Sequence, residues 1–97
     1  MEINVEELKI IHNEAESRFE IWLEDSLSKL DYLRDGNTIV MMHVGVPIDL
    51  RGHGIAACLT RAALAYAGKN SLRVIPMCSY VIAYIHRHPE YQELIKG

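Results

Sequence analysis

Cysteine is scarce in this sequence, and its scarcity excludes two kinds of protein. The chain has two cysteines, Cys58 and Cys78, which fall in different predicted elements. Disulfide-held secreted domains and zinc modules carry several cysteines at short, regular spacings. The pair His86 and His88 has no carboxylate or thiolate at ligand spacing beside it. We therefore expect two reduced thiols, no disulfide framework and no metal site.

Long apolar runs and clusters of basic charge are also missing. No stretch approaches the roughly eighteen apolar residues that a membrane-spanning helix needs, and the first residues lack the basic start of a secretory signal. Ten Lys and Arg residues stand against 13 Asp and Glu residues, for a formal net charge of −3, and the arginines are dispersed. We expect a cytoplasmic protein with no membrane and no nucleic-acid partner.

The composition is that of an ordinary globular domain. Hydrophobic residues make up 49% of the chain and charged residues 24%, so neither disorder nor an unusual scaffold is indicated. A chain of 97 residues is the size of one domain. We expect a single domain over residues 1–97, with residues 1–7 frayed or forming a short helical lead-in.

Alternating hydrophobicity and turn signals predict a meander of four antiparallel strands in the first half of the chain. Asp35-Gly36 predicts a tight hairpin between the third and fourth strands. The fourth strand is apolar at almost every position, which is typical of a central strand covered on both faces. The predicted strands span residues 8–12, 17–23, 27–34 and 38–46.

The second half of the chain predicts a helix, a strand and a helix. The first helix runs from Gly54 to a left-handed cap at Gly68 or Asn70. A short strand over 72–76 leads to a second helix, which Ser79 caps and Pro89 prevents from continuing. The whole pattern predicts an α+β fold.

Gly52 and Gly54 lie where the apolar strand over 38–46 gives way to a helix rich in small residues. Glycine allows positive φ and close approach, so backbone N–H groups can converge on an anion at the start of the helix. We interpret this turn as a phosphate cradle. The alternative is that the two glycines only make a tight strand-to-helix connection.

Two other phosphate-binding loops fit less well. A Walker A loop is excluded because no Lys in this region is followed by Ser or Thr. The spacing Gly-x-Gly-x-x-Ala matches a dinucleotide fingerprint, but the strand near Val74 lacks the acidic residue that would hold a ribose. The chain is also too short for a full doubly wound domain.

The segment Val46-Pro47-x-x-x-Arg51-Gly52-x-Gly54-Ile55-Ala56 resembles the acetyl-CoA loop, Arg/Gln-x-x-Gly-x-Gly/Ala, of the GNAT N-acetyltransferase superfamily. The resemblance covers residues 10–95 and is closest to a small, single-domain branch of that superfamily. The other matching residues are His12-Asn13, Arg18-Phe19, Leu30-x-Tyr32, His43, Val74-Ile75-Pro76-x-Cys78 and Tyr84-Ile85-x-Arg87-His88-Pro89-Glu90-Tyr91.

The resemblance implies a GNAT-like fold and acetyl-CoA as cosubstrate, with no metal in the chemistry. Strands ending at Val46 and Pro76 would part, and the pantetheine arm would pair with the main chain of the first. One of the same main-chain N–H groups would stabilise the oxyanion. The residues expected to bind the cosubstrate are Val44, Gly45, Val46, Arg51, Gly52, His53, Gly54, Ile55 and Ala56.

Three side chains are candidates for the chemistry: Cys78, Tyr84 and His43. Cys78 would lie at a helix N-terminus, which favours a thiolate, as leaving-group acid, acceptor-positioning group or transient acetyl carrier, or simply as a small buried residue. Tyr84 is either a second candidate acid or core packing. His43 is the candidate general base, or else a hydrogen-bonded core residue. The resembled family reads His-Thr-Glu-Val where this chain has Gly45 in place of the acidic residue.

Three functions follow from these observations. The first is acetyl transfer in a ternary complex to an unidentified amine acceptor, a protein or peptide lysine among the candidates. The second is a catalytically weak acyl-CoA-binding or protein-interaction module on a GNAT scaffold. The third is a structural domain whose Gly-x-Gly is only a turn. The acceptor site is expected to be open, and both a monomer and a homodimer are compatible with the sequence.

Overall fold

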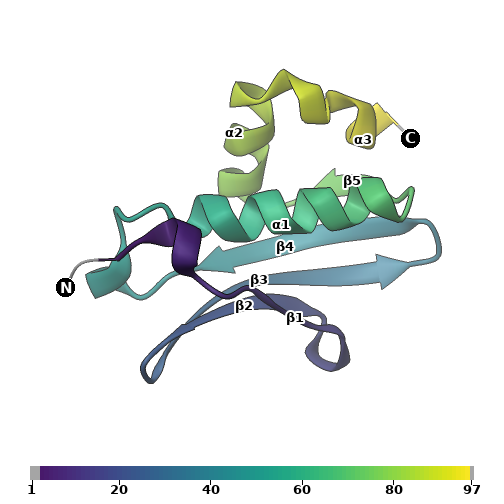
Figure 1. Ribbon diagram of the computed structural model, residues 1–97. Helices are drawn as coiled ribbons and strands as arrows, with labels where there is room; N and C mark the ends of the chain where they lie inside the picture. Colours follow the sequence, from purple (N-terminus) through teal and green to yellow (C-terminus); the bar gives the residue numbers. More distant parts are fainter. Residues whose placement is uncertain (1–2, 97) are drawn as a thin grey trace.

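A computed structural model describes residues 3–96 as one sheet with helices packed on it (Figure 1). Five strands follow one another across the sheet in chain order. They are β1 (Ile11–Asn13), β2 (Arg18–Leu23), β3 (Ser26–Asp35), β4 (Thr38–Gly45) and β5 (Arg73–Pro76). Neighbours are antiparallel except β4 and β5, which are parallel and joined by helix α1 (Ile55–Lys69). Helices α2 (Ser79–Arg87) and α3 (Gln92–Lys96) follow. The predicted α+β class is confirmed.

The hairpin predicted at Asp35-Gly36 is confirmed, because Asp35 pairs with Thr38 and Gly36 has a φ of 58°. The predicted first strand over 8–12 is wrong in position. The side chain of Asn4 accepts a hydrogen bond from the Glu6 N–H and caps a short 3-10 helix, η1 (Val5–Glu7). Residues 8–10 have no regular structure, and the chain enters the sheet only at Ile11. Residues 1 and 2, within the segment expected to fray, lie outside the described residues.

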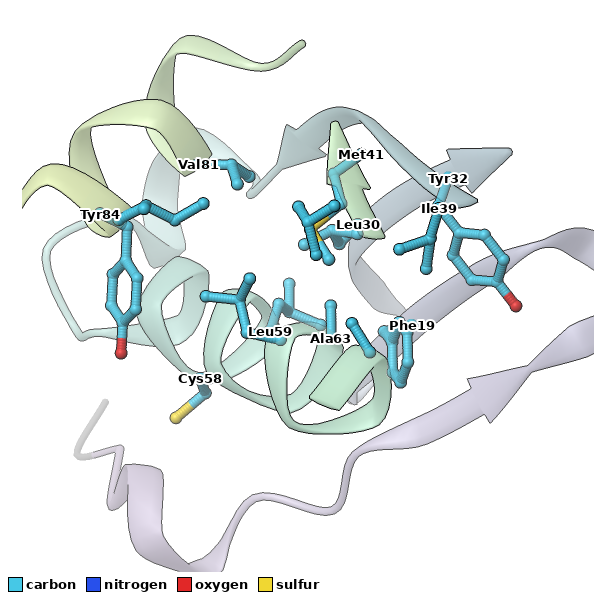
Figure 2. Packing of buried hydrophobic residues seen from close by; sticks show 14 of the residues in the cluster. Phe19, Leu30, Tyr32, Ile39, Met41, Cys58, Leu59, Ala63, Val81 and Tyr84 are labelled. Carbon is cyan, nitrogen blue, oxygen red and sulfur yellow. The ribbon is translucent and has the colours of Figure 1, made fainter. Parts of the chain in front are cut away.

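Helix α1 lies across one face of the sheet and buries its apolar stripe there. Leu59 and Ala63 are fully buried and pack in one cluster with Leu30, Ile39 and Met41 from the strands (Figure 2). The small side chain of Ala63 allows a close approach of helix to sheet. The buried residues of α1 recur at helical spacing: Ile55, Cys58, Leu59, Thr60, Ala63, Leu64 and Ala67.

The predicted left-handed cap of α1 is wrong. Asn70 has a φ of −100°, and the left-handed residue is Ser71, with a φ of 55°. The Asn70 side chain donates a hydrogen bond of 2.8 Å to the Tyr66 carbonyl, and its backbone N–H also bonds to that carbonyl. The Tyr66 carbonyl at the end of the helix therefore has hydrogen-bond partners without a left-handed residue at Gly68 or Asn70.

The predicted N-cap at Ser79 is also wrong, because Cys78 occupies the N-cap position and Ser79 is the first helical residue. Helix α2 ends before Pro89, as predicted, but the chain then resumes helical structure as a 3-10 turn, η4 (Pro89–Tyr91), and α3. Proline is tolerated at the first position of a helical turn because no N–H is needed there.

The prediction that the fourth strand is covered on both faces is wrong. Tyr32 pairs with Met41 and Asp31 with His43, which leaves Met42 as the extra residue of a β-bulge. Met42 is 43% exposed, whereas Ile39 and Met41 are fully buried. We call the side of β1–β4 turned away from α1 the outer face. By strand register it comprises Ile11, Asn13, Arg18, Glu20, Trp22, Leu27, Lys29, Asp31, Leu33, Asp35, Thr38, Val40, His43 and Gly45.

Candidate functional site

A cavity of about 410 Å³ opens beside the end of β4, on the same side of the sheet as α1. The glycine turn and the first residues of α1 form one wall, and β4 with its continuation forms the other. The lining residues are Val44, Val46, Leu50, Arg51, Gly52, Gly54, Ile55, Ala56 and Tyr80. Most of the residues expected from the sequence to bind a cosubstrate therefore share one cavity.

The start of α1 carries no cap. Gly54 occupies the N-cap position with a φ of 84°, no side chain among the described residues caps the N–H groups of the first turn, and that turn contains no acidic residue. Gly52 also has a positive φ, 85°, so both predicted glycine positions need glycine for their backbone conformation. The first N–H groups of a helix lack intrahelical partners and carry partial positive charge. This wall of the cavity is suited to an anion.

One expected residue that lines the cavity is already hydrogen-bonded within the chain, and two others do not line it. Arg51 folds back along the loop, and its Nε donates a hydrogen bond of 3.1 Å to the Val46 carbonyl. The Arg51 guanidinium is thus hydrogen-bonded to a main-chain carbonyl that was expected to pair with the pantetheine arm. His53 is exposed and does not line the cavity, and Gly45 does not line it either.

The pairing of β4 with β5 stops at Met41 and Pro76, although β4 continues to Gly45. The Met41 carbonyl accepts the N–H groups of both Met77, at 2.9 Å, and Cys78, at 3.2 Å. These two bonds turn the chain away from β4 and place the half-buried Cys78 where the strands part. The residues of β4 beyond Met41 are left without a β5 partner.

His43 and Gly45 lie on the outer face, on the opposite side of β4 from Val44, which lines the cavity. The imidazole of His43 is exposed and covers Gly45, since a Cβ added at Gly45 would meet its Nε2 at 3.2 Å. Placing His43 in the core is therefore wrong. The bulge at Met42 explains the error, because it shifts the alternation so that His43 turns outward.

The two tyrosines of α2, the candidate Tyr84 and Tyr80, differ in position. Tyr84 is 4% exposed and packs in the core cluster with Leu59 and Val81 (Figure 2), and its ring stacks on His88 at 4.1 Å. It does not line the cavity, whereas Tyr80 does. Burial raises the pKa of Tyr80 above its usual value, so its phenol stays protonated at neutral pH and can donate a hydrogen bond.

Residues 18–94 match the family model described as GCN5-related N-acetyl-transferase. The chain belongs to this family. The GNAT chain is 29% identical over 93 residues to Protein NATD1 of Danio rerio, an alignment covering 91% of this chain and 84% of that relative. The NMR solution structure of a GCN5-like protein from Staphylococcus aureus superposes with a TM-score of 0.72 at 29% identity, covering 90% of this chain and 86% of the other.

Membership supports acetyl transfer as the general activity of this GNAT chain and acetyl-CoA as its donor, and the GNAT-like fold expected from the loop motif is confirmed. Within residues 3–96, no helix is long and apolar enough to span a bilayer. The same part of the chain contains no group of three or more His, Cys, Asp or Glu residues placed to hold a metal ion.

Sequence reasoning missed Tyr80 as a site residue of this GNAT chain. Tyr80 and Tyr84 are four positions apart on one helix, and both are compatible with an apolar stripe. Tyr80 follows the N-cap Cys78 by two positions, which places it on the first turn of α2, next to the cavity mouth. That closeness to the start of the helix was the available signal.

Proposed function

We propose that this GNAT chain transfers the acetyl group of acetyl-CoA to a primary amine in a ternary complex. The observation that carries the proposal is the cavity whose wall is the uncapped start of α1. The diphosphate of the cosubstrate binds the N–H groups of residues 52–56, and the pantetheine arm extends along residues 44–46 toward the parting of β4 and β5. Arg51 supplies a cation once it leaves the Val46 carbonyl.

The reaction requires one nucleophilic substitution at the thioester. The amine nitrogen attacks the acetyl carbonyl carbon, the carbon–sulfur bond breaks, and the nitrogen loses a proton while the thiolate gains one. His43, at the outer side of β4, accepts the proton from the amine. A main-chain N–H of residues 44–46 stabilises the oxyanion.

Two residues near the parting of β4 and β5 are candidates to protonate the departing thiolate. Tyr80 lines the cavity and keeps its proton at neutral pH. Cys78 lies at the N-cap of α2, two residues after the end of β5. We assign the proton to Tyr80 and the positioning of the thioester to Cys78. Tyr84, packed in the core, has no part in this step.

Release of free CoA thiol during incubation with acetyl-CoA and a panel of amines tests the proposal. We expect turnover with the wild-type chain, and His43→Gln to lower kcat by about 10²-fold or more. Tyr80→Phe should lower kcat more than Tyr84→Phe. Binding of acetyl-CoA without turnover of any amine would favour the acyl-CoA-binding module instead.

A further inference from the structure

Trp22 is exposed on the outer face, yet its orientation is fixed. Its side chain is 47% exposed, and its indole Nε1 donates a hydrogen bond of 3.1 Å to the carboxylate of Glu20. Glu20 is itself only 4% exposed. The same carboxylate accepts bonds from Arg18 Nε at 2.5 Å and from Asn13 Nδ2 at 3.0 Å. The buried carboxylate of Glu20 thus accepts three hydrogen bonds, and one of them holds the solvent-facing indole of Trp22 in place.

Such a ring is pre-organised for contact with a partner. Aromatic side chains that lose little freedom on binding are the usual anchors of protein interfaces. The hydrogen bond from Arg18 is the main reason that the pKa of Glu20 lies below its usual range. The carboxylate therefore remains an acceptor for the indole at neutral pH.

Apolar side chains and two ion pairs surround Trp22 on the outer face. Leu27 pairs with Trp22 across β2 and β3, and Ile11, opposite Glu20, is 38% exposed on the same face. Arg18 pairs with Glu20 at 2.5 Å, and Lys29 pairs with Asp31 at 3.4 Å. Because these four charges have opposite partners within the chain, the outer face around Trp22 matches a partner segment with apolar side chains better than a strongly charged polymer.

The outer face is continuous with the proposed reaction site. Glu20 pairs with Lys29, and Lys29 pairs with Gly45, so these three residues are level with one another across the sheet. Trp22 is therefore two strands away from Gly45 and two residues further along the strand direction. Strand spacing and rise place it about 11 Å from Gly45. The cosubstrate cavity opens on the α1 side, so an acceptor reaches the thioester from the outer face. A second copy of the chain bound here would cover His43 and block that route.

We propose that the outer face docks the acceptor as an extended segment of a protein, with Trp22 as its anchor; this rests on the proposed function. Small-molecule sites are concave, whereas Trp22 stands on an open sheet face. About 11 Å corresponds to roughly three or four residues of extended chain. Because the His43 imidazole covers Gly45, an acceptor lysine at that ring is three or four residues from an apolar side chain that contacts the indole.

The single tryptophan of the chain makes its fluorescence a direct probe of this surface. End-blocked octapeptides with one lysine and one leucine three or four residues away, in either direction, are titrated against the CoA-loaded protein. Matched peptides carry serine in place of leucine. We expect the leucine peptides to change the emission of Trp22 and to have KM values about tenfold lower than the serine peptides.

Variants separate anchoring from folding and from chemistry. Trp22→Ala should raise the KM of the leucine peptides about tenfold and Glu20→Gln severalfold, with kcat for a small amine such as spermidine and the CoA-induced thermal shift unchanged. Ile82→Ala, at an exposed apolar residue of α2, should leave the peptide KM unchanged. Equal KM values for both peptide sets, or no response of Trp22 emission, would overturn the proposal.

Two further outcomes are diagnostic. A change of Trp22 emission with protein concentration alone, without peptide, would identify a second copy as the occupant and overturn the proposal. If acetyl-CoA gives no thermal shift and spermidine no turnover, the proposed function fails. Peptide-dependent emission of Trp22 would then still establish the docking surface by itself.

Discussion

The imidazole of His43 covers the α-carbon of Gly45, at a distance that leaves no free space for a Cβ. We predict that Gly45→Ala displaces the ring by a few tenths of an ångström and lowers kcat severalfold, with less effect than His43→Gln. Gly45 does not have positive φ, so the backbone accepts alanine. Measured stability within about 1 kcal/mol of wild type would show that the loss is local. Unchanged kcat in both variants would remove His43 from the chemistry.

The conformation of Gly54 gives a second prediction. Its φ of 84° is a left-handed conformation that costs other residues about 1–2 kcal/mol, so Gly54→Ala should lower the free energy of unfolding by that amount and weaken acetyl-CoA binding. Gly68→Ala is the matched control. Gly68 is within α1, and a Cβ there meets Leu94 at an ordinary 3.8 Å, so this change should stabilise the protein by about 0.5–1 kcal/mol. Denaturant unfolding of both variants is the measurement, and equal effects would contradict the loop geometry.

Ser28 has a buried hydroxyl with no hydrogen-bond partner among the described residues. An unpaired buried polar group destabilises the folded state by about 1–3 kcal/mol, so Ser28→Ala should raise the free energy of unfolding. Thr60 provides the opposite case, because its hydroxyl donates to the Ala56 carbonyl at 2.8 Å. Thr60→Val should destabilise the protein by about 1 kcal/mol. A loss of stability in Ser28→Ala would show that a water satisfies the hydroxyl.

His12 predicts how stability depends on pH. Its ring stacks on Phe19 at 4.1 Å, and its Nε2 lies 2.6 Å from the Tyr32 hydroxyl. Burial is the main cause that lowers the pKa of His12 below 6.5, and the Arg34 charge adds to it while Glu14 opposes it. As the pH falls, His12 therefore takes up a proton in the unfolded chain before it does so in the folded chain.

The stability contributed by neutral His12 is complete above pH 6.5 and is lost as the pH falls through the lower folded-state pKa. Chemical unfolding at several pH values should show this decline for the wild type and a flatter profile for His12→Gln. Identical profiles would mean that His12 is not desolvated in the folded chain.

Local signals in the sequence located most of the elements. The Asp35-Gly36 turn, the alternation of β2 and β3 and the stripe of α1 each follow from contacts between near neighbours along the chain. The helix after Pro89 was missed because Leu94 and Ile95 are held by packing against the core cluster, which local propensity does not reveal. The first strand was misplaced because its bounds are set by pairing with β2, which begins at Ile11 opposite Glu20, and local hydrophobicity does not reveal that pairing.

In the candidate site, too, features set by local sequence could be predicted and features set by long-range packing could not. Gly52 and Gly54 could be predicted because a backbone position with positive φ favours glycine. The side of β4 on which His43 lies could not, because the bulge at Met42 reverses the alternation and carries no distinct signal in the sequence. Tyr80 was missed because its place in the cavity wall depends on where α2 lies relative to the cavity, a long-range relationship.

Amide chemical shifts during titration with acetyl-CoA test the claim that the diphosphate binds at the start of α1. We predict the largest changes at the N–H groups of residues 52–56, with smaller ones along 44–46. A second cavity, lined by Asn37, Thr38, Ser71, Leu72, Arg73, Glu93 and Leu94, lies at the β5 edge of the sheet. Changes confined to that cavity, or no changes at saturating ligand, would contradict the claim.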